Sequence, residues 1–234
     1  MSFQGKNILI VGASSGIGYA IAKTLENEGA TLFTASRTAP ENLTNQHIVW
    51  DVTQPATGLF DTLPDTLHGI VYAPGTISLK PFQRFSTTDF QSDFQINVLG
   101  AVAVLQANLN RLRKANGASI VLFSTVAVQT GMGFHASIAA SKGAIEGLTR
   151  SLAAEFAPTK IRCNALAPSL TDTPLAGSLL ANDEKREASA KRHPLGRVGT
   201  PQDIASAARW LLSDEGSWVT GQVIGIDGGI GKLK

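Results

Sequence analysis

The sequence predicts a doubly wound α/β domain, in which helices cover both faces of a parallel sheet. Three observations support this prediction: short apolar segments alternate with helical patterns, those segments show little polar alternation, and a glycine cluster follows the first of them. Continuous apolar segments are typical of strands that are buried on both faces. Right-handed crossovers between such strands place helices on both sides of the sheet.

Seven segments are predicted to form strands because they are short and rich in Ile, Val and Leu. In chain order they are Asn7–Val11, Thr31–Ala35, His47–Trp50, Gly69–Ala73, Ser119–Phe123, Ile161–Leu166 and Gln222–Ile226.

Four segments carry helical patterns. The first places Ile17, Ile21 and Leu25 on one stripe, as an amphipathic helix requires. Pro201 opens the last, at a position where its missing N–H leaves no helical bond unmade. The predicted helices are Gly16–Glu28, Phe90–Arg113, Ser141–Phe156 and Pro201–Leu212.

No repeat, linker or low-complexity segment divides the chain, so we predict one domain over residues 1–234. The least regular segment is 169–199, which contains Pro174, Pro194, several glycines and a run of charged residues. Such a segment after a strand end can fold over a ligand. We therefore predict a substrate lid at 169–199; a surface helix with a loop is the alternative.

Composition and charge argue against several functional classes. Charged residues make up 16% of the chain, against about 25% in a typical soluble domain, which favours burial of surface in an oligomer. A net charge of +2 is too small to indicate nucleic acid or an anionic membrane as partner. The single Cys163 favours a reducing compartment, and no apolar run approaches the roughly 18 residues of a membrane span. We expect a cytoplasmic protein.

The segment from Gly12 to Gly18 predicts a dinucleotide site. Its glycines follow the first predicted strand and open the first predicted helix, which is the context that a phosphate-binding turn requires. Without side chains the backbone can approach a pyrophosphate, and the helix N-terminus supplies free N–H groups. The candidate contacts in this turn are Gly12, Ser14, Ser15, Ile17 and Gly18.

Ser36 and Arg37, at the end of the second predicted strand, indicate NADP(H). A site for the cofactor without the 2′-phosphate usually has Asp or Glu here, and Ser36-Arg37-Thr38 contains neither. Arg37 can pair with the phosphate, and a charge-assisted hydrogen bond contributes roughly 1.5–3 kcal/mol. A solvated surface arginine is the alternative.

Over nearly its whole length the chain resembles the short-chain dehydrogenase/reductase family. The glycine turn is similar to the family's Gly-x-x-x-Gly-x-Gly, and Pro194-Leu195-Gly196-Arg197 and Asp227-Gly228-Gly229 resemble its C-terminal signatures. The resemblance implies a Rossmann-type seven-stranded sheet, a nicotinamide cofactor, a small or medium carbonyl or alcohol substrate, and a homotetramer or homodimer.

The resemblance also implies cofactor contacts outside the glycine turn. They belong to segments similar to those that hold the adenine ring, the ribose and the nicotinamide amide in the family. These residues are Ser36, Arg37, Asp51, Val52, Ala73, Gly75, Lys142, Pro168, Leu170 and Thr173.

Three residues correspond to the family's catalytic groups. Asn97 falls where the family has an asparagine that binds a water beside the lysine, and Lys142 matches that lysine. Thr125 has the spacing of the catalytic serine. Ser124 is its neighbour, but successive strand side chains point to opposite faces, so only one of the two should serve.

Ile138 stands where the resemblance places the tyrosine that donates a proton. Loss of a positioned acid lowers a rate by roughly 10²–10⁴-fold. Three substitutes remain open: His135, which shares a helical face with Ile138 and Lys142 if the segment is helical; a water relayed by Thr125 and Lys142; or Lys142 itself. A cap or packing role is the alternative for His135.

Two functional hypotheses follow. The first is an NADP(H)-dependent oxidoreductase that transfers a hydride between nicotinamide and a carbonyl or alcohol, with an unusual proton donor. The second is a protein on the same fold that binds or senses NADP(H) without catalysis.

Overall fold

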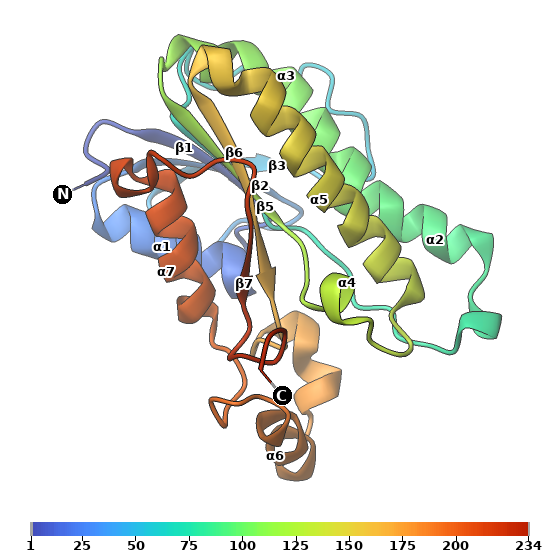
Figure 1. Cartoon of the computed structure of the whole chain (residues 1–234). Helices are drawn as coiled ribbons and strands as arrows, with labels where there is room; N and C mark the ends of the chain where they lie inside the picture. Colours follow the sequence, from blue (N-terminus) through green and yellow to red (C-terminus); the bar gives the residue numbers. More distant parts are fainter. Residues whose placement is uncertain (1, 234) are drawn as a thin grey trace.

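The protein, represented by a computed structural model that describes residues 2–233, is built on one seven-stranded parallel sheet (Figure 1). The strand order is β3-β2-β1-β4-β5-β6-β7, so the order reverses between β1 and β4. In such sheets, ligands bind beyond the carboxyl ends of the strands at this reversal. The strands are β1 (Asn7–Val11), β2 (Thr31–Ser36), β3 (Asn45–Val49), β4 (Gly69–Tyr72), β5 (Ala118–Phe123), β6 (Ile161–Pro168) and β7 (Val223–Ile226).

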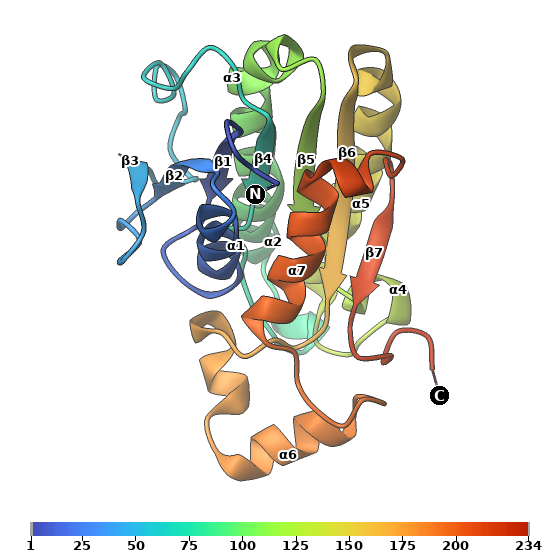
Figure 2. The same ribbon diagram turned by 90° about the vertical axis from the view of Figure 1, so that its left-hand side faces the viewer.

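Helices cover both faces of the sheet (Figure 2). The α-helices are α1 (Gly16–Asn27), α2 (Thr87–Phe94), α3 (Gly100–Lys114), α4 (Ala127–Thr130), α5 (Ala136–Phe156), α6 (Asp183–Lys191) and α7 (Pro201–Leu212). Shorter 3₁₀ segments are η1 (Phe82–Arg84), η3 (Ala157–Thr159), η4 (Pro174–Leu180) and η5 (Asp214–Gly216), and η2 (Gln95–Leu99) is a π-helical turn between α2 and α3.

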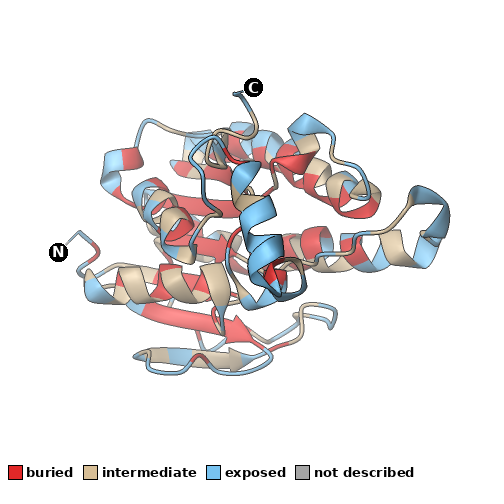
Figure 3. Cartoon of the chain, turned by 90° about the horizontal axis from the view of Figure 1, so that it is seen from below, coloured by how far each residue is buried: buried red, intermediate tan, exposed pale blue. Residues whose placement is uncertain are grey.

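The core has two layers because each strand buries both of its faces. In β1, Leu9 and Val11 pack in the layer that contains α3 and α5, while Ile8 and Ile10 pack in the layer that contains α1 and α7. Burying one such side chain contributes roughly 1.5–3 kcal/mol. Buried residues accordingly concentrate where the helices meet the sheet (Figure 3).

The predicted fold class is confirmed, with a strand at each of the seven predicted places. The third strand begins two residues earlier than predicted, at Asn45.

Two helix predictions were wrong in their extent. The predicted helix Phe90–Arg113 begins at Thr87, after a capping box between Ser86 and Asp89, and a π-helical turn interrupts it at Gln95–Leu99. The predicted helix Ser141–Phe156 begins five residues earlier, at Ala136, because the small residues before Ser141 continue the helix.

The segment 169–199 contains η4 and α6, and a bridge between Thr171 and Gly199 closes it at its base. Whether this segment moves as a lid stays a prediction. Among residues 2–233 no helix is long and apolar enough to cross a membrane.

Candidate active site

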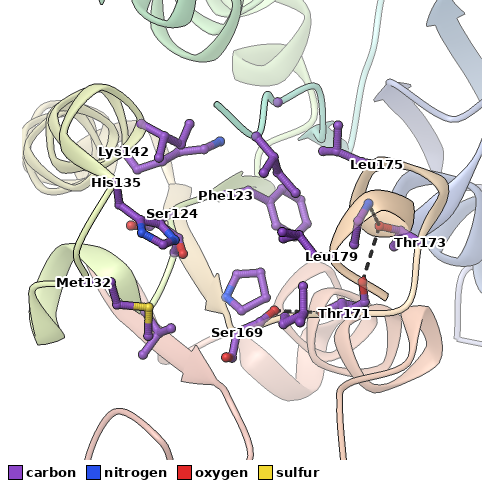
Figure 4. Close-up of a pocket in the computed structure, with 18 of the residues that line it drawn as sticks. Phe123, Ser124, Met132, His135, Lys142, Ser169, Thr171, Thr173, Leu175 and Leu179 are labelled. Atoms are coloured by element: carbon purple, nitrogen blue, oxygen red, sulfur yellow. Dashed lines mark hydrogen bonds between the residues drawn. The ribbon is translucent and has the colours of Figure 1, made fainter. Parts of the chain in front are cut away.

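A cavity of about 310 Å³ opens beyond the carboxyl ends of β4, β5 and β6 (Figure 4). Lys142, His135 and Ser124 lie on one side of it, and Thr171, Thr173 and Leu175 lie on the other. Nine of the predicted site residues line this cavity: Ile17, Ala73, Gly75, Thr125, His135, Lys142, Pro168, Leu170 and Thr173.

The backbone of the glycine turn is not covered by side chains of the turn itself. Gly12 has a φ of +83°, and a Cβ there would lie 3.0 Å from the backbone nitrogen of Pro74. A Cβ at Gly18 would overlap the carbonyl oxygen of Gly12. Ser15 is the N-cap of α1, yet its hydroxyl makes no capping bond and remains exposed. Backbone N–H groups at the start of α1 are therefore accessible, as binding of a pyrophosphate requires.

The residues predicted to hold the adenosine end lie outside the cavity lining. Arg37 is exposed and its charge acts on the Asp51 carboxylate, whose pKa is lowered mainly by the backbone amide and hydroxyl of Thr53. Ser36 is buried, and its hydroxyl donates to the carbonyl of Thr38 at 2.9 Å. Val52 is half-buried against the core. Within the described chain, Arg37 makes no ion pair, so its guanidinium is free to bind an anion.

Lys142 projects from α5 into the cavity, and its side chain is almost entirely buried. Burial lowers the pKa of Lys142 from 10.5 to about 8, against a smaller opposing effect of the Asp93 charge. A Cβ added at Gly75 would lie 3.6 Å from Nζ of Lys142 and 3.4 Å from Oδ1 of Asn97. Among residues 2–233, Nζ makes no hydrogen bond, so this buried amine has no direct polar partner.

Asn97 lies in the π-helical turn η2 and is fully buried. Its Nδ2 donates to the carbonyl of Asp93 at 2.8 Å and to Oγ1 of Thr76 at 3.0 Å. Its Oδ1 is buried without a partner among the described residues. A buried unsatisfied acceptor is costly and indicates a bound water or ligand group.

Tyr72 holds the turn that presents Asn97. Its hydroxyl donates to the carbonyl of Ile96 at 2.5 Å, and burial raises its pKa. Gly100 makes room for this phenol, since a Cβ there would overlap its oxygen. Tyr72 therefore has a structural role and is not a free acid in the cavity.

Both Ser124 and Thr125 line the cavity, so the expected alternation of a strand does not separate them. The reason is that β5 ends at Phe123, before either residue. Hydrogen bonding distinguishes them instead. The Ser124 hydroxyl donates to the Glu146 carboxylate at 2.7 Å, whereas Oγ1 of Thr125 only accepts from the N–H of Ala127, at 3.4 Å.

His135, Ile138 and Lys142 share one face at the start of α5, as predicted for a helical segment, and all three line the cavity. His135 occupies the N-cap position but makes no capping bond. Its Nδ1 donates to the carbonyl of Gly133 at 2.6 Å, which leaves Nε2 free among residues 2–233. Ile138 is buried and presents only hydrocarbon to the cavity.

Sequence reasoning missed the polar residues that support this wall. The Asp93 carboxylate accepts from Thr76 and from Ser137, each at 2.6 Å, and so ties α2 to α5 behind Lys142. The only signal was the spacing of Asp93 and Asn97, which are four residues apart and therefore on one helical face. The hydrogen bond between Ser169 and His193, which line the same cavity, was also not predicted from the sequence.

Comparison with known proteins places the chain in a family. A family model described as enoyl-(acyl carrier protein) reductase matches residues 12–231. The chain belongs to the short-chain dehydrogenase/reductase family. Among its relatives, 2,3-dihydro-2,3-dihydroxybenzoate dehydrogenase of Escherichia coli is 33% identical and covers 98% of each chain.

Two further similar proteins also align with this chain over nearly their whole length. The 3-oxoacyl-(acyl-carrier-protein) reductase of Thermotoga maritima is 33% identical, over 98% of this chain and 99% of the relative. The ligand-free structure of aldohexose dehydrogenase from Thermoplasma acidophilum is 30% identical, with a TM-score of 0.90 over 97% of this chain and 94% of that structure.

The residues of this chain fit a nicotinamide cofactor. The glycine turn has no side chains at positions where a Cβ would collide with backbone, so its backbone stays open to a ligand. Two polar atoms lack partners among residues 2–233: Nζ of Lys142, which lines the cavity, and Oδ1 of Asn97, which lies near Gly75 in the cavity wall. A ribose and an ordered water are groups that could satisfy them.

Proposed function

We propose that this protein is an NADP(H)-dependent oxidoreductase that interconverts a small or medium carbonyl compound and its alcohol. The observation that carries the proposal is that Lys142 and Thr125 line one cavity beside the glycine turn, while Oδ1 of Asn97, partnerless among the described residues, lies near Gly75 in the wall of that cavity. Family membership supports the redox class.

Each part of the cofactor has a counterpart in this proposal. The glycine turn and Ser15 hold the pyrophosphate, Arg37 holds the 2′-phosphate, and Asp51 with Val52 borders the adenine. Lys142 binds the nicotinamide ribose, while the backbone near Leu170 and the hydroxyl of Thr173 hold the amide. Bound there, the reduced nicotinamide supplies a hydride to the carbonyl carbon.

The protein must stabilise the negative charge that develops on the substrate oxygen. The Thr125 hydroxyl can donate to that oxygen, and the buried ammonium of Lys142 stabilises the charge because burial excludes bulk water there. Because its pKa is about 8, Lys142 is a stronger acid than an ordinary lysine and can also release a proton near neutral pH. His135 and a water held by Asn97 are the other proton sources to be tested.

The composition of the cavity wall favours a substrate with an apolar part. Most of the lining surface is apolar, as is typical of small-molecule sites, although eleven of the lining residues have polar side chains. Its apolar side chains include Ile77, Leu79, Phe123, Val126, Ile138, Leu175 and Leu179.

One observation favours the second hypothesis, in which the protein binds or senses NADP(H) without turnover. Ile138 fills the part of the wall where a proton donor is expected, and it offers no polar atom. In this case cofactor binding would still stabilise the fold.

The two hypotheses are separated by assaying NADPH oxidation with a panel of aldehydes, ketones and thioesters, alongside thermal stabilisation by NADPH. The oxidoreductase proposal predicts stabilisation together with turnover of at least one carbonyl. Stabilisation without turnover across the panel would support the binding protein instead, and a protein that shows neither would contradict both hypotheses.

A further inference from the structure

A hydroxyl–imidazole pair lines the same cavity as Ile138. Oγ of Ser169, the residue that follows β6, lies 2.8 Å from Nε2 of His193, which follows α6. Both residues line the cavity, and His193 is 95% buried because its exposed fraction is only 5%. In Figure 4 Ser169 lies between the side that carries His135 and the side that carries Thr171.

The hydrogen bonds of His193 define where its protons are. Its Nδ1 lies 2.8 Å from the carbonyl oxygen of Ser189, and a carbonyl can only accept, so Nδ1 carries a proton. In the neutral ring Nε2 then accepts from the Ser169 hydroxyl. In the imidazolium Nε2 donates to Oγ, which leaves the hydroxyl proton of Ser169 available to the cavity. The pair can therefore exist in two states that differ by one proton.

Ser169 lines the same cavity as Thr125 and Lys142, the groups that surround the proposed reaction. The N–H of Val126 donates to the carbonyl of Pro168 at 3.1 Å. The segments that follow β5 and β6, which carry Thr125 and Ser169, therefore remain side by side. The Thr171 hydroxyl donates to the carbonyl of Ser169 at 3.0 Å and holds this backbone in place. Three hydroxyl groups at adjacent strand ends, those of Ser124, Thr125 and Ser169, thus line one cavity, and among them only that of Ser169 contacts an imidazole.

The charged groups near His193 bond to other partners, and Nε2 of His193 contacts Ser169. Across a second cavity of about 120 Å³, Arg197 and Asp203 are paired with each other, and the Asp227 carboxylate accepts from backbone amides of Gly229 and Gly231. Of the two residues that precede His193 in the chain, Lys191 pairs with Glu187, and Arg192 contacts the sulfur of Met132.

We propose that Ser169 and His193 supply the proton that Ile138 cannot, with Ser169 as the group that touches the substrate. The inference rests on the proposed oxidoreductase function. As hydride adds to the carbonyl carbon, the π electron pair moves to the oxygen, which takes the proton of the Ser169 hydroxyl. Oγ in turn takes the Nε2 proton of the imidazolium. The products are the alcohol, an intact Ser169 and a neutral imidazole that accepts from it, and solvent later returns the proton to His193.

The test is a double-mutant cycle of His193→Gln with Ile138→Tyr, measured as kcat/KM with NADPH and a carbonyl that the wild type reduces. In the wild-type background His193→Gln should lower kcat/KM by about 10²-fold, the effect of losing a positioned acid. In the Ile138→Tyr background the loss should fall below about threefold, because the phenol then supplies the proton. Ile138→Phe, which adds the ring without the hydroxyl, should not reduce the effect.

Ser169→Gly should reproduce the pattern of His193→Gln in both backgrounds, with the dissociation constant of NADPH unchanged. Ser178→Ala serves as the matched control, because Ser178 is an exposed serine of the same segment and does not line the cavity. A second readout needs no turnover: ¹⁵N NMR of the histidine rings should show a protonated Nδ1 in His193 and a change at Nε2 in Ser169→Gly.

Equal losses from His193→Gln in the two backgrounds would assign His193 a structural role and overturn the inference, while the oxidoreductase function would stand. No loss at all would overturn it in the same way. A wild type that binds NADPH but reduces no carbonyl would instead overturn the proposed function, and this inference with it. An Nε2 that is unaffected by Ser169→Gly would remove the hydrogen bond on which the inference depends.

Discussion

The glycine turn at Gly12–Gly18 and the wall around Lys142 lie beside the same sheet edge, but they are built in opposite ways. The turn offers backbone from one short segment and excludes side chains: a Cβ at Gly18 would overlap the oxygen of Gly12. The wall around Lys142 offers side chains, and these come from α2, η2 and α5.

The difference explains how each region tolerates change. A backbone cradle depends on the absence of atoms, so an added methyl group damages it. A side-chain wall depends on a network, in which Asp93 joins Thr76 to Ser137 and leaves Lys142 and Asn97 with unused polar atoms. Substitutions in the two regions should therefore differ in what they damage.

Lys142→Met should lower kcat/KM by at least about 10²-fold, because one preorganised donor is worth that much in a buried site. The change removes the charge and keeps most of the side-chain volume. Steady-state NADPH oxidation measures the effect, with Lys114→Met, on the exposed pair with Asp65, as the control. A variant with more than half of the wild-type rate would show that the wall does not require the amine.

The same variant should change how stability depends on pH. Folded Lys142 has a pKa of about 8 instead of 10.5, so between these values the unfolded chain binds more protons and the free energy of unfolding of the wild type rises with pH. At pH 7, without cofactor, Lys142→Met should be more stable than the wild type by about 3 kcal/mol, since 2.5 pKa units correspond to about that energy.

Urea unfolding of both proteins from pH 7 to pH 10.5 measures this difference, which should disappear toward the upper end. Other groups that titrate in this range cancel in the comparison. A difference that does not change with pH would mean that Lys142 is charged in the fold without penalty.

Gly18→Ala should destabilise the fold by about 1–3 kcal/mol, the usual effect of overpacking, and should weaken NADPH binding as the turn shifts. Gly147→Ala is the matched control: it lies inside α5 with nothing within 4 Å of the added methyl. That change should stabilise the protein by about 0.5–1 kcal/mol, because glycine is unfavourable inside a helix. Thermal unfolding with and without NADPH compares the two variants. Equal effects of both substitutions would mean that the turn has room for a Cβ at Gly18.

Arg37→Ala should remove most of a preference for NADPH over NADH, about tenfold in the ratio of dissociation constants. The guanidinium is exposed and without an ion pair among the described residues, so its removal should leave NADH binding unchanged. Arg113→Ala, at the far end of α3, is the control. If the ratio of the two dissociation constants remains the same in Arg37→Ala, then another group binds the 2′-phosphate.

The same contrast explains what the sequence predicts well. The strands and the glycine turn are local: β1 and its turn follow from Asn7–Gly18 alone, because burial on both faces and missing side chains are visible in the pattern. Lys142, Ile138 and His135 also share a face, as helical spacing predicts.

The sequence predicts much less of what joins distant segments. The π-helical turn at Asn97 depends on Tyr72, which lies 25 positions earlier in the chain, and Asp93 bonds to Ser137, 44 positions later. The pairing of Ser169 with His193 depends on the path of segment 169–199, in which α6 contains no apolar residue larger than alanine to set a period. A linear pattern carries no information on these partners until the sheet brings them together.

Calorimetric titration of NADPH into the purified protein is the decisive measurement, because every role proposed for the cavity depends on this nucleotide. We expect saturable binding at one site per chain, with NADPH bound about tenfold more tightly than NADH. A protein that binds neither nucleotide would have neither the cofactor site nor the chemistry proposed for it.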